Sequence, residues 1–202
     1  MGTVAMKTVK LDTPIGKSTI VIGERLENLK QYLPANHPII ITDTNVQKHW
    51  GHLFPPGAVF TIDTGEGIKT LETVSSLYDK LLELDADRKS FVVGIGGGIV
   101  CDIAGFVAST YMRGIRFGFV STTLLSQVDA SVGGKTGLDV PWGKNLLGAF
   151  HQPDLVIIDP RVLRTLAKEH FTSGMAEVVK HGVIRDASLL TFLEERSGEL
   201  EP

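Results

Sequence analysis

The sequence lacks the features that mark several classes of protein. It contains a single cysteine, Cys101, so no intramolecular disulfide can form, and we expect this thiol to be a small core side chain. The most apolar stretch, 91–108, is interrupted by Asp102 and five glycines, whereas a membrane-spanning helix needs about 20 mostly apolar residues. Residues 1–7 have no charged head, apolar run or cleavage site of a secretory signal. These absences predict a cytoplasmic protein with no membrane segment.

The sequence also has no excess of positive charge. The chain has 20 Lys and Arg against 23 Asp and Glu, and no basic stripe, so we expect no nucleic-acid partner. Its 202 residues, 43% hydrophobic and 21% charged, are typical of a globular protein and allow one domain or one and a half.

Apolar runs bounded by turn residues alternate with segments of helical period, which predicts an α/β fold with a parallel sheet. An N-terminal β-hairpin is expected from 8–11 and 19–22. The further strands are expected at 38–42, 59–63, 90–95, 116–120 and 155–158, and the helices at 24–33, 45–53, 68–84 and 99–110.

Two later stretches differ from this pattern. Residues 133–148 are rich in glycine and lysine, and we interpret them as a candidate binding surface. Beyond residue 160 the strand pattern stops, and 171–195 is predicted to be helical. We therefore expect either the start of a second, truncated domain or a C-terminal helix that packs back on the sheet.

A glycine-rich turn, 94–102, follows a predicted buried strand and begins a predicted helix. Free backbone N–H groups at such a helix start bind anions, and glycines let a pyrophosphate approach the backbone. Ile99 occupies the place of the third glycine of G-x-G-x-x-G, so a turn without a ligand is the alternative. Asp102, one turn into the helix, can cap N–H groups or accept hydrogen bonds from a ribose.

Residues 129–136 resemble the end of a P-loop, but Asp129 stands where that loop requires glycine, so we set a P-loop NTPase aside. The basic and amide side chains nearby suit an anionic substrate that carries carboxylate or phosphate; ordinary surface charge is the alternative. This set comprises Arg113, Lys135, Lys144, Asn145 and Lys180. Glu177 and His181 would share a helix face as metal ligands can, or form a simple hydrogen-bonded pair.

Several segments together resemble one family, 3-dehydroquinate synthase, within the sugar-phosphate cyclases. They are ITDTNV at 41–46, GEGIK at 65–69, GGGIVCDIAGF at 96–106, YMRG at 111–114, TTLLSQVDASVGGKTG at 122–137, KNLLGAF at 144–150 and GMAEVVKHG at 174–182. They follow the family's order. One segment departs from the family's pattern: 167–170 reads Ala-Lys-Glu-His, where the family typically has Pro-x-Arg-Glu.

The resemblance implies a Rossmann-like NAD-binding domain over 1–160 and, over 161–202, the first helical part of an all-α metal-binding domain. It implies a lyase of the shikimate pathway and aromatic amino acid biosynthesis. The substrate would be 3-deoxy-D-arabino-heptulosonate 7-phosphate and the products 3-dehydroquinate and phosphate, with NAD used and returned in each turnover and Zn²⁺ or Co²⁺ as the metal. At full length a homodimer is expected.

The resemblance also assigns residues. The NAD contacts would be Asp43, Asn45, Thr64, Glu66, Lys69, Gly97, Gly98, Ile99, Asp102, Thr122, Thr123, Lys135, Lys144, Val162 and Thr165. The catalytic, substrate-binding set would be Arg113, Asp129, Lys135, Lys144, Asn145 and Lys180. Glu177 would be one metal ligand, with a histidine pair expected beyond residue 202, so His181 is not assigned and this chain is expected to be inactive alone.

The sequence leaves alternative functions open. One is a related cyclase, for example one acting on glucose 6-phosphate, and another is a group III metal-dependent alcohol dehydrogenase of the same fold. A non-catalytic NAD-binding module is a third.

Overall fold

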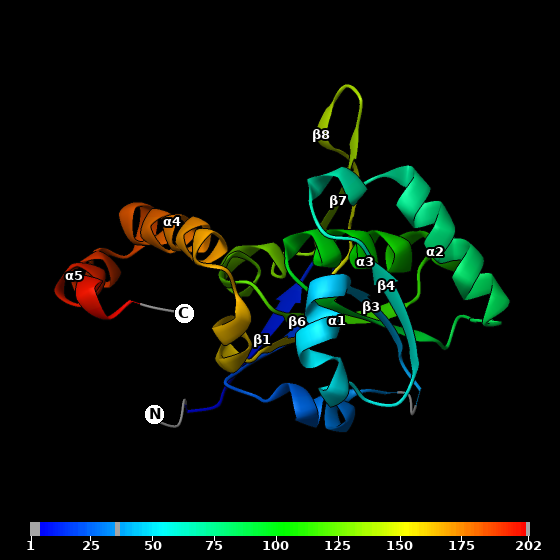
Figure 1. Cartoon of the computed structure of the whole chain (residues 1–202), viewed down its shortest axis with the longest axis horizontal. Coiled ribbons are helices and arrows are strands. Elements are labelled where there is room, and N and C mark those ends of the chain that lie inside the picture. The colour runs from blue at the N-terminus through cyan, green and yellow to red at the C-terminus, as the bar shows by residue number, and fades with distance from the viewer. Residues whose placement is uncertain (1–4, 35–36, 201–202) are drawn as a thin grey trace.

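The computed structural model describes residues 5–34 and 37–200 (Figure 1). The expectations about a leader at the first residues and about the chain's end rest partly on 1–4 and 201–202, which lie outside the described residues. Within the described ranges, no helix is long and apolar enough to cross a membrane.

A seven-stranded sheet forms the centre of the fold, in the order β1-β2-β9-β6-β5-β3-β4. β1 pairs antiparallel with β2, as the predicted hairpin requires, and the other strand pairs of this sheet are parallel. Its strands are β1 (Lys7–Thr13), β2 (Gly16–Ile22), β3 (Ile39–Asp43), β4 (Ala58–Ile62), β5 (Phe91–Gly96), β6 (Arg116–Ser121) and β9 (Leu155–Ile158). The predicted α/β fold with a mostly parallel sheet is confirmed.

Two apolar layers cover the faces of this sheet. On one face, α2 (Leu71–Glu83) and α3 (Gly98–Thr110) bury Leu77 and Ile103 against Ile41. On the other face, α1 (Thr44–Trp50) and the 3₁₀ helices η1 (Leu26–Tyr32) and η6 (Pro160–Thr165) pack against alternate residues of the same strands. Alternation of side chains along each strand supplies both layers.

The predicted α-helix at 24–33 is instead the 3₁₀ helix η1. Leu26 and Leu29 are fully buried in it. Side chains three residues apart eclipse one another in a 3₁₀ helix, so this geometry points both leucines at the sheet. The Leu26 N–H also donates to the buried Asp159 carboxylate at 3.0 Å, which fixes the start of the turn.

The glycine-rich stretch 133–148 contains an antiparallel hairpin of β7 (Lys135–Val140) and β8 (Gly143–Phe150). The hairpin projects away from the main sheet (Figure 1). Its register shifts between Leu138 and Val140, so the strands lack the regular alternation from which they could have been predicted.

The predicted helical stretch 171–195 is two helices, α4 (Lys168–Arg185) and α5 (Ala187–Glu195). Asp186 separates them with an extended backbone, and its carboxylate accepts hydrogen bonds from the N–H groups of Ser188 and Leu189, which begins α5. Both helices extend to one side of the sheet rather than packing back over it (Figure 1). The alternative of a C-terminal helix on the sheet is therefore wrong.

Candidate functional site

A cleft of about 520 Å³ lies where the parallel strands end. Its floor is made by residues that follow β3, β4, β5 and β6 at their carboxyl ends. The chain leaves β3 and β5 in opposite directions across the sheet, and ligands of α/β proteins bind at such a reversal of strand order. The cleft is thus positioned by topology.

The glycine-rich turn forms one wall of the cleft. β5 ends at Gly96 and α3 begins at Gly98 with Gly97 as N-cap and no side-chain cap, so the first N–H groups of α3 have no side-chain partner. A Cβ on Gly97 would lie 2.8 Å from Thr123 Cγ2, and one on Gly96 would lie 2.4 Å from Val100 Cβ. Glycine is required here by close packing, and the uncapped helix start suits a phosphate.

The structure brings most of the predicted NAD contacts to this cleft. Those that line it are Asp43, Asn45, Thr64, Glu66, Gly97, Gly98, Ile99, Thr122, Thr123, Val162 and Thr165. Asp43 is the N-cap of α1; burial raises its pKa, although the N–H groups of Val46 and Asn45 donate to its carboxylate. Lys69, Asp102, Lys135 and Lys144 are not among the lining residues.

Asp102 does not cap α3. Its Oδ2 lies 2.6 Å from Lys69 Nζ, and Lys69 Nζ also donates to Asn145 Oδ1. Burial raises the pKa of Asp102, while the Lys69 ammonium opposes that rise. The Asp102 carboxylate is therefore paired with a lysine of the same chain.

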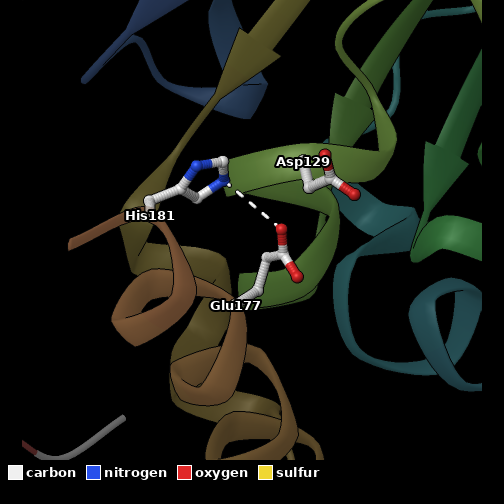
Figure 2. Close-up of side chains that lie close together, drawn as sticks. All are labelled: Asp129, Glu177 and His181. Carbon is white, nitrogen blue, oxygen red and sulfur yellow. Dashed lines mark ion pairs between the residues drawn. The ribbon is translucent and has the colours of Figure 1, made fainter. Parts of the chain in front are cut away.

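Asp129, Glu177 and His181 form a second cluster (Figure 2). One ligand atom from each lies within 4.8 Å of the others. Glu177 and His181 are one turn apart on α4, and Asp129 lies on the π-helical turn η5 (Ser126–Ala130), a geometry common at functional sites. The fold therefore adds Asp129 and His181 to the one predicted metal ligand.

The donor set fits a divalent metal. His181 Nε2 is a buried atom that makes no hydrogen bond within the described residues, and Glu177 Oε1, also buried, faces it. Nε2 lies 3.4 Å from Oε1, and the Lys180 ammonium pairs with the same oxygen, which raises the pKa of Lys180. Two carboxylates and an imidazole are ligands that Zn²⁺ and Co²⁺ accept.

The other predicted substrate residues are spread around these two centres. Lys144 Nζ lies 3.4 Å from Glu66 Oε1 at the cleft, and Lys180 lies at the metal cluster. Lys135 begins β7, and Arg113 follows α3 with a positive φ of 69°. Across 5–34 and 37–200, neither Arg113 nor Lys135 has an ion pair, so both cations are available to an anion.

Sequence reasoning missed several residues of the cleft. Trp50 Nε1 donates to Thr165 Oγ1 at 2.9 Å, which joins α1 to η6 across the cleft. His170 and Ser173 reach the cleft from the first turns of α4, and His170 belongs to the segment 167–170 that departs from the family's pattern. Together with Glu177 and His181 they follow a helical spacing, a polar stripe visible in the sequence.

Comparisons with known proteins agree with this geometry. Residues 59–173 match the family described as 3-dehydroquinate synthase N-terminal. The 3-dehydroquinate synthase of Clostridium kluyveri is 45% identical over 181 residues, which cover 86% of this chain and 50% of the relative. The chain spans about half the length of the curated relatives it matches.

Solved structures are similar as well. The 2-epi-5-epi-valiolone synthase of Streptomyces hygroscopicus, with NAD⁺ and Zn²⁺ bound, has a TM-score of 0.85 and 31% identity over 99% of this chain and 57% of that one. A 2-deoxy-scyllo-inosose synthase complexed with carbaglucose-6-phosphate, NAD⁺ and Co²⁺ has a TM-score of 0.75 and 29% identity, covering 87% and 51%.

Proposed function

This chain belongs to the 3-dehydroquinate synthase family, and from that premise we propose that the protein is itself a 3-dehydroquinate synthase. It converts 3-deoxy-D-arabino-heptulosonate 7-phosphate to 3-dehydroquinate and phosphate with NAD and a divalent metal. The observation that carries the proposal is the pairing, in one chain, of an uncapped glycine-turn cleft with a separate carboxylate–imidazole cluster. At full length we expect a homodimer.

The cleft would hold NAD. The N–H groups at the start of α3 suit the pyrophosphate, and Asp43 and Glu66 offer acceptors for ribose hydroxyls. When bound, NAD supplies reversible removal of hydride from a substrate alcohol. The residues of this chain would orient the nucleotide, and the Trp50–Thr165 hydrogen bond joins two of the elements that line the cleft.

Glu177, with Asp129 and His181 beside it, would hold the metal, which when bound polarises substrate hydroxyls as a Lewis acid. Glu177 must release the Lys180 ammonium from Oε1 for this, which leaves that ammonium available to a substrate anion. Lys144, Asn145, Lys135 and Arg113 would give charge-assisted hydrogen bonds to carboxylate and phosphate.

The identities favour this substrate over those of related cyclases. Curated 3-dehydroquinate synthases are 42–54% identical to this chain, whereas the cyclase structures with other products are 29–31% identical. The dehydrogenase structures are 16–19% identical and support the fold alone.

The activity test uses the protein at its full natural length. Phosphate release from the heptulosonate phosphate, dependent on NAD⁺ and Zn²⁺ and without net NADH, is the expected result. Steady NADH accumulation would indicate a dehydrogenase, and release from glucose 6-phosphate alone would indicate another cyclase. The 202-residue chain is expected to bind NAD⁺ and Co²⁺ without releasing phosphate.

Binding by the chain itself separates the two centres. Co²⁺ titration followed by visible absorption should give a spectrum that Glu177→Gln and His181→Ala abolish or weaken by about 10-fold to 100-fold. His49→Ala is the matched control, since His49 lies in α1 away from the cluster. A spectrum unchanged in both variants would contradict the metal site.

A further inference from the structure

Lys69 is a buried lysine in a chain whose other cations are mostly at the surface. It is 4% exposed and follows the 3₁₀ helix η3 (Glu66–Ile68) between β4 and α2. Lysine is almost never fully buried unless its charge is paired. Here the ammonium lies 2.6 Å from Asp102 Oδ2 and donates to Asn145 Oδ1, so one side chain joins α3 to the β7–β8 hairpin.

The main chain of Lys69 contacts the same hairpin. The Asp139 N–H donates to the Lys69 carbonyl at 2.8 Å, and the Asp139 carboxylate accepts from the Asn145 N–H at 2.8 Å. Asp139 lies at the register shift between β7 and β8. Both strands of the hairpin are thus attached to one residue, through a closed ring of Lys69, Asp139 and Asn145.

Asn145 is held in an unusual conformation by these contacts. Its φ is +56°, in the left-handed region, and a Cβ on the facing Gly137 would lie 2.9 Å from Asn145 Oδ1. Asparagine tolerates this region better than most residues, and Gly137 leaves room for its amide. The conformation of Asn145 and the absence of a side chain at Gly137 thus allow the Asn145 amide to accept from Lys69.

The second link between the hairpin and the cleft is weak. Lys144 pairs with Glu66 at 3.4 Å, but their side chains are 72% and 46% exposed. Exposed ion pairs contribute little to stability, and salt screens them. Leu138 packs in the core beneath α3 and holds β7, whereas β8 is mostly exposed, so the buried Lys69–Asn145 contact is the link that holds the β8 side of the hairpin.

We propose that Lys69 is a positioning residue that fixes the β7–β8 hairpin, and with it Lys144 and Asn145, at the rim of the nucleotide cleft. It acts through Asn145 and Asp139 rather than by touching the substrate. Because Asp102 holds the same ammonium, the start of α3 and the hairpin are mechanically coupled. The role in substrate binding rests on the proposed function; the anchoring of the hairpin does not.

Hydrogen exchange of the chain without ligands tests the anchoring. Lys69→Met is expected to speed exchange of the Asp139 and Asn145 amides by about tenfold, because a charge-assisted hydrogen bond is lost. Lys80→Met is the matched control, since Lys80 lies in α2 with its ammonium over the Phe60 ring of β4. Hairpin exchange that stays unchanged in Lys69→Met would overturn the proposal.

A double-mutant cycle guards against general loss of stability. Asn145→Ala leaves the Lys69–Asp102 pair in place and should also speed exchange of the Asp139 amide. If Lys69 acts through Asn145, the double variant is no faster than the more affected single variant. Effects that multiply would show that Lys69 acts elsewhere and would overturn the proposal.

Kinetics of the full-length protein test the positioning. Lys69→Met should raise KM for the sugar acid phosphate by about tenfold with a smaller fall in kcat, since Lys144 and Asn145 of the hairpin are proposed to bind the substrate. An unchanged KM would overturn the positioning role. If the wild-type protein releases no phosphate at all, the proposed function fails while the exchange result on the hairpin stands.

Discussion

The sheet region, which comprises the seven-stranded sheet and the helices that cover its two faces, and the α4–α5 segment bury their residues in opposite ways. In α3, seven of 13 residues are buried, including Val100, Ile103 and Val107. In the 18 residues of α4 the only buried positions are Gly174 and Gly182. Val183 and Ile184 are each 67% exposed. One region is a packed core, and the other presents apolar side chains without a partner in the described residues.

This difference indicates that one region provides most of the stability and that the other provides side chains to the functional sites. The sheet region holds the apolar layers and most of the cleft, whereas α4 contributes His170 and Ser173 to the cleft and two of the three clustered groups that could bind a metal. Elements with few buried contacts open at low free energy, and functional segments are commonly drawn from them. Binding at the metal cluster should therefore depend on how α4 is docked, and unfolding should not.

Truncation of one isoleucine in each region gives the largest expected contrast. Ile41→Ala removes a fully buried side chain from β3 and should lower the free energy of unfolding by about 2–5 kcal/mol. Ile184→Ala, on the exposed face of α4, should change it by less than about 0.5 kcal/mol. Urea unfolding measures both. Equal losses would show that α4 is part of the core.

Asp159, the N-cap of η6, should have the next largest effect. This residue is 2% exposed, and its carboxylate accepts from the Leu26 N–H and from Arg161. Asp159→Asn should lower the free energy of unfolding by about 1–3 kcal/mol at neutral pH, because these buried donors lose a charged acceptor. Asp12→Asn, in an exposed pair with Lys17, is the control and should have almost no effect.

The pH dependence of this contrast has a definite sign. Burial raises the pKa of Asp159, but hydrogen bonds from Arg161 and from the Leu26 and Arg161 N–H groups bring it below its usual value. A lowered pKa stabilises the folded state above the unfolded pKa, about 3.9, and this stabilisation is lost as pH falls through the folded pKa. The difference between wild type and Asp159→Asn should therefore shrink in acid.

The sequence was sufficient to predict the packed region but not its additions. Apolar runs at 90–95 and 155–158 identified β5 and β9, because short, nearly continuous runs of Val and Ile are typical of fully buried parallel strands. The β7–β8 hairpin escaped because its register shift and the left-handed Asn145 break the alternation. The helix break at Asp186 was visible as an Asx cap and was overlooked.

The metal cluster shows the limit more sharply. Glu177 and His181 are linked by helical spacing, but no spacing rule joins them to Asp129, which reaches them only through the packing of α4 on η5. The nucleotide cleft was easier, since parallel strands bring their carboxyl ends to one edge. Contacts made by topology are predictable, and contacts made by one helix packing on one turn are not.

Gly174 tests that packing directly. A Cβ there would lie 2.7 Å from Leu124 Cβ and 2.8 Å from the Leu125 backbone N, so Gly174→Ala must shift α4 away from the residues that lead into η5. We expect Co²⁺ affinity to fall by about tenfold, as when an outer-shell support of a metal site is lost. The free energy of unfolding should change far less than in Ile41→Ala.

Gly182→Ala is the matched control for Gly174→Ala. Its Cβ would meet the Leu190 side chain at 2.7 Å, whose flexible end can move aside, and it lies on the same helix. Co²⁺ affinity should then stay unchanged. Equal losses of affinity in both variants would mean that helix propensity, rather than docking on η5, controls the cluster.

The smallest effect is expected at the cap of α5. Asp186→Ala removes the acceptor for the Ser188 and Leu189 N–H groups and should speed amide exchange in α5 by about fivefold. Ser188→Ala removes only the hydrogen bond from the Ser188 hydroxyl and should speed exchange less.

The pH dependence of this cap follows from its hydrogen bonds. The hydroxyl of Ser188 and these N–H groups lower the pKa of Asp186, so the cap persists above the usual aspartate pKa and weakens as pH falls through the folded pKa. The free energy of unfolding of the sheet region, measured in urea, should stay unchanged in both variants, because Leu193 is the one buried side chain of α5. A lower free energy of unfolding would show that the two regions unfold together.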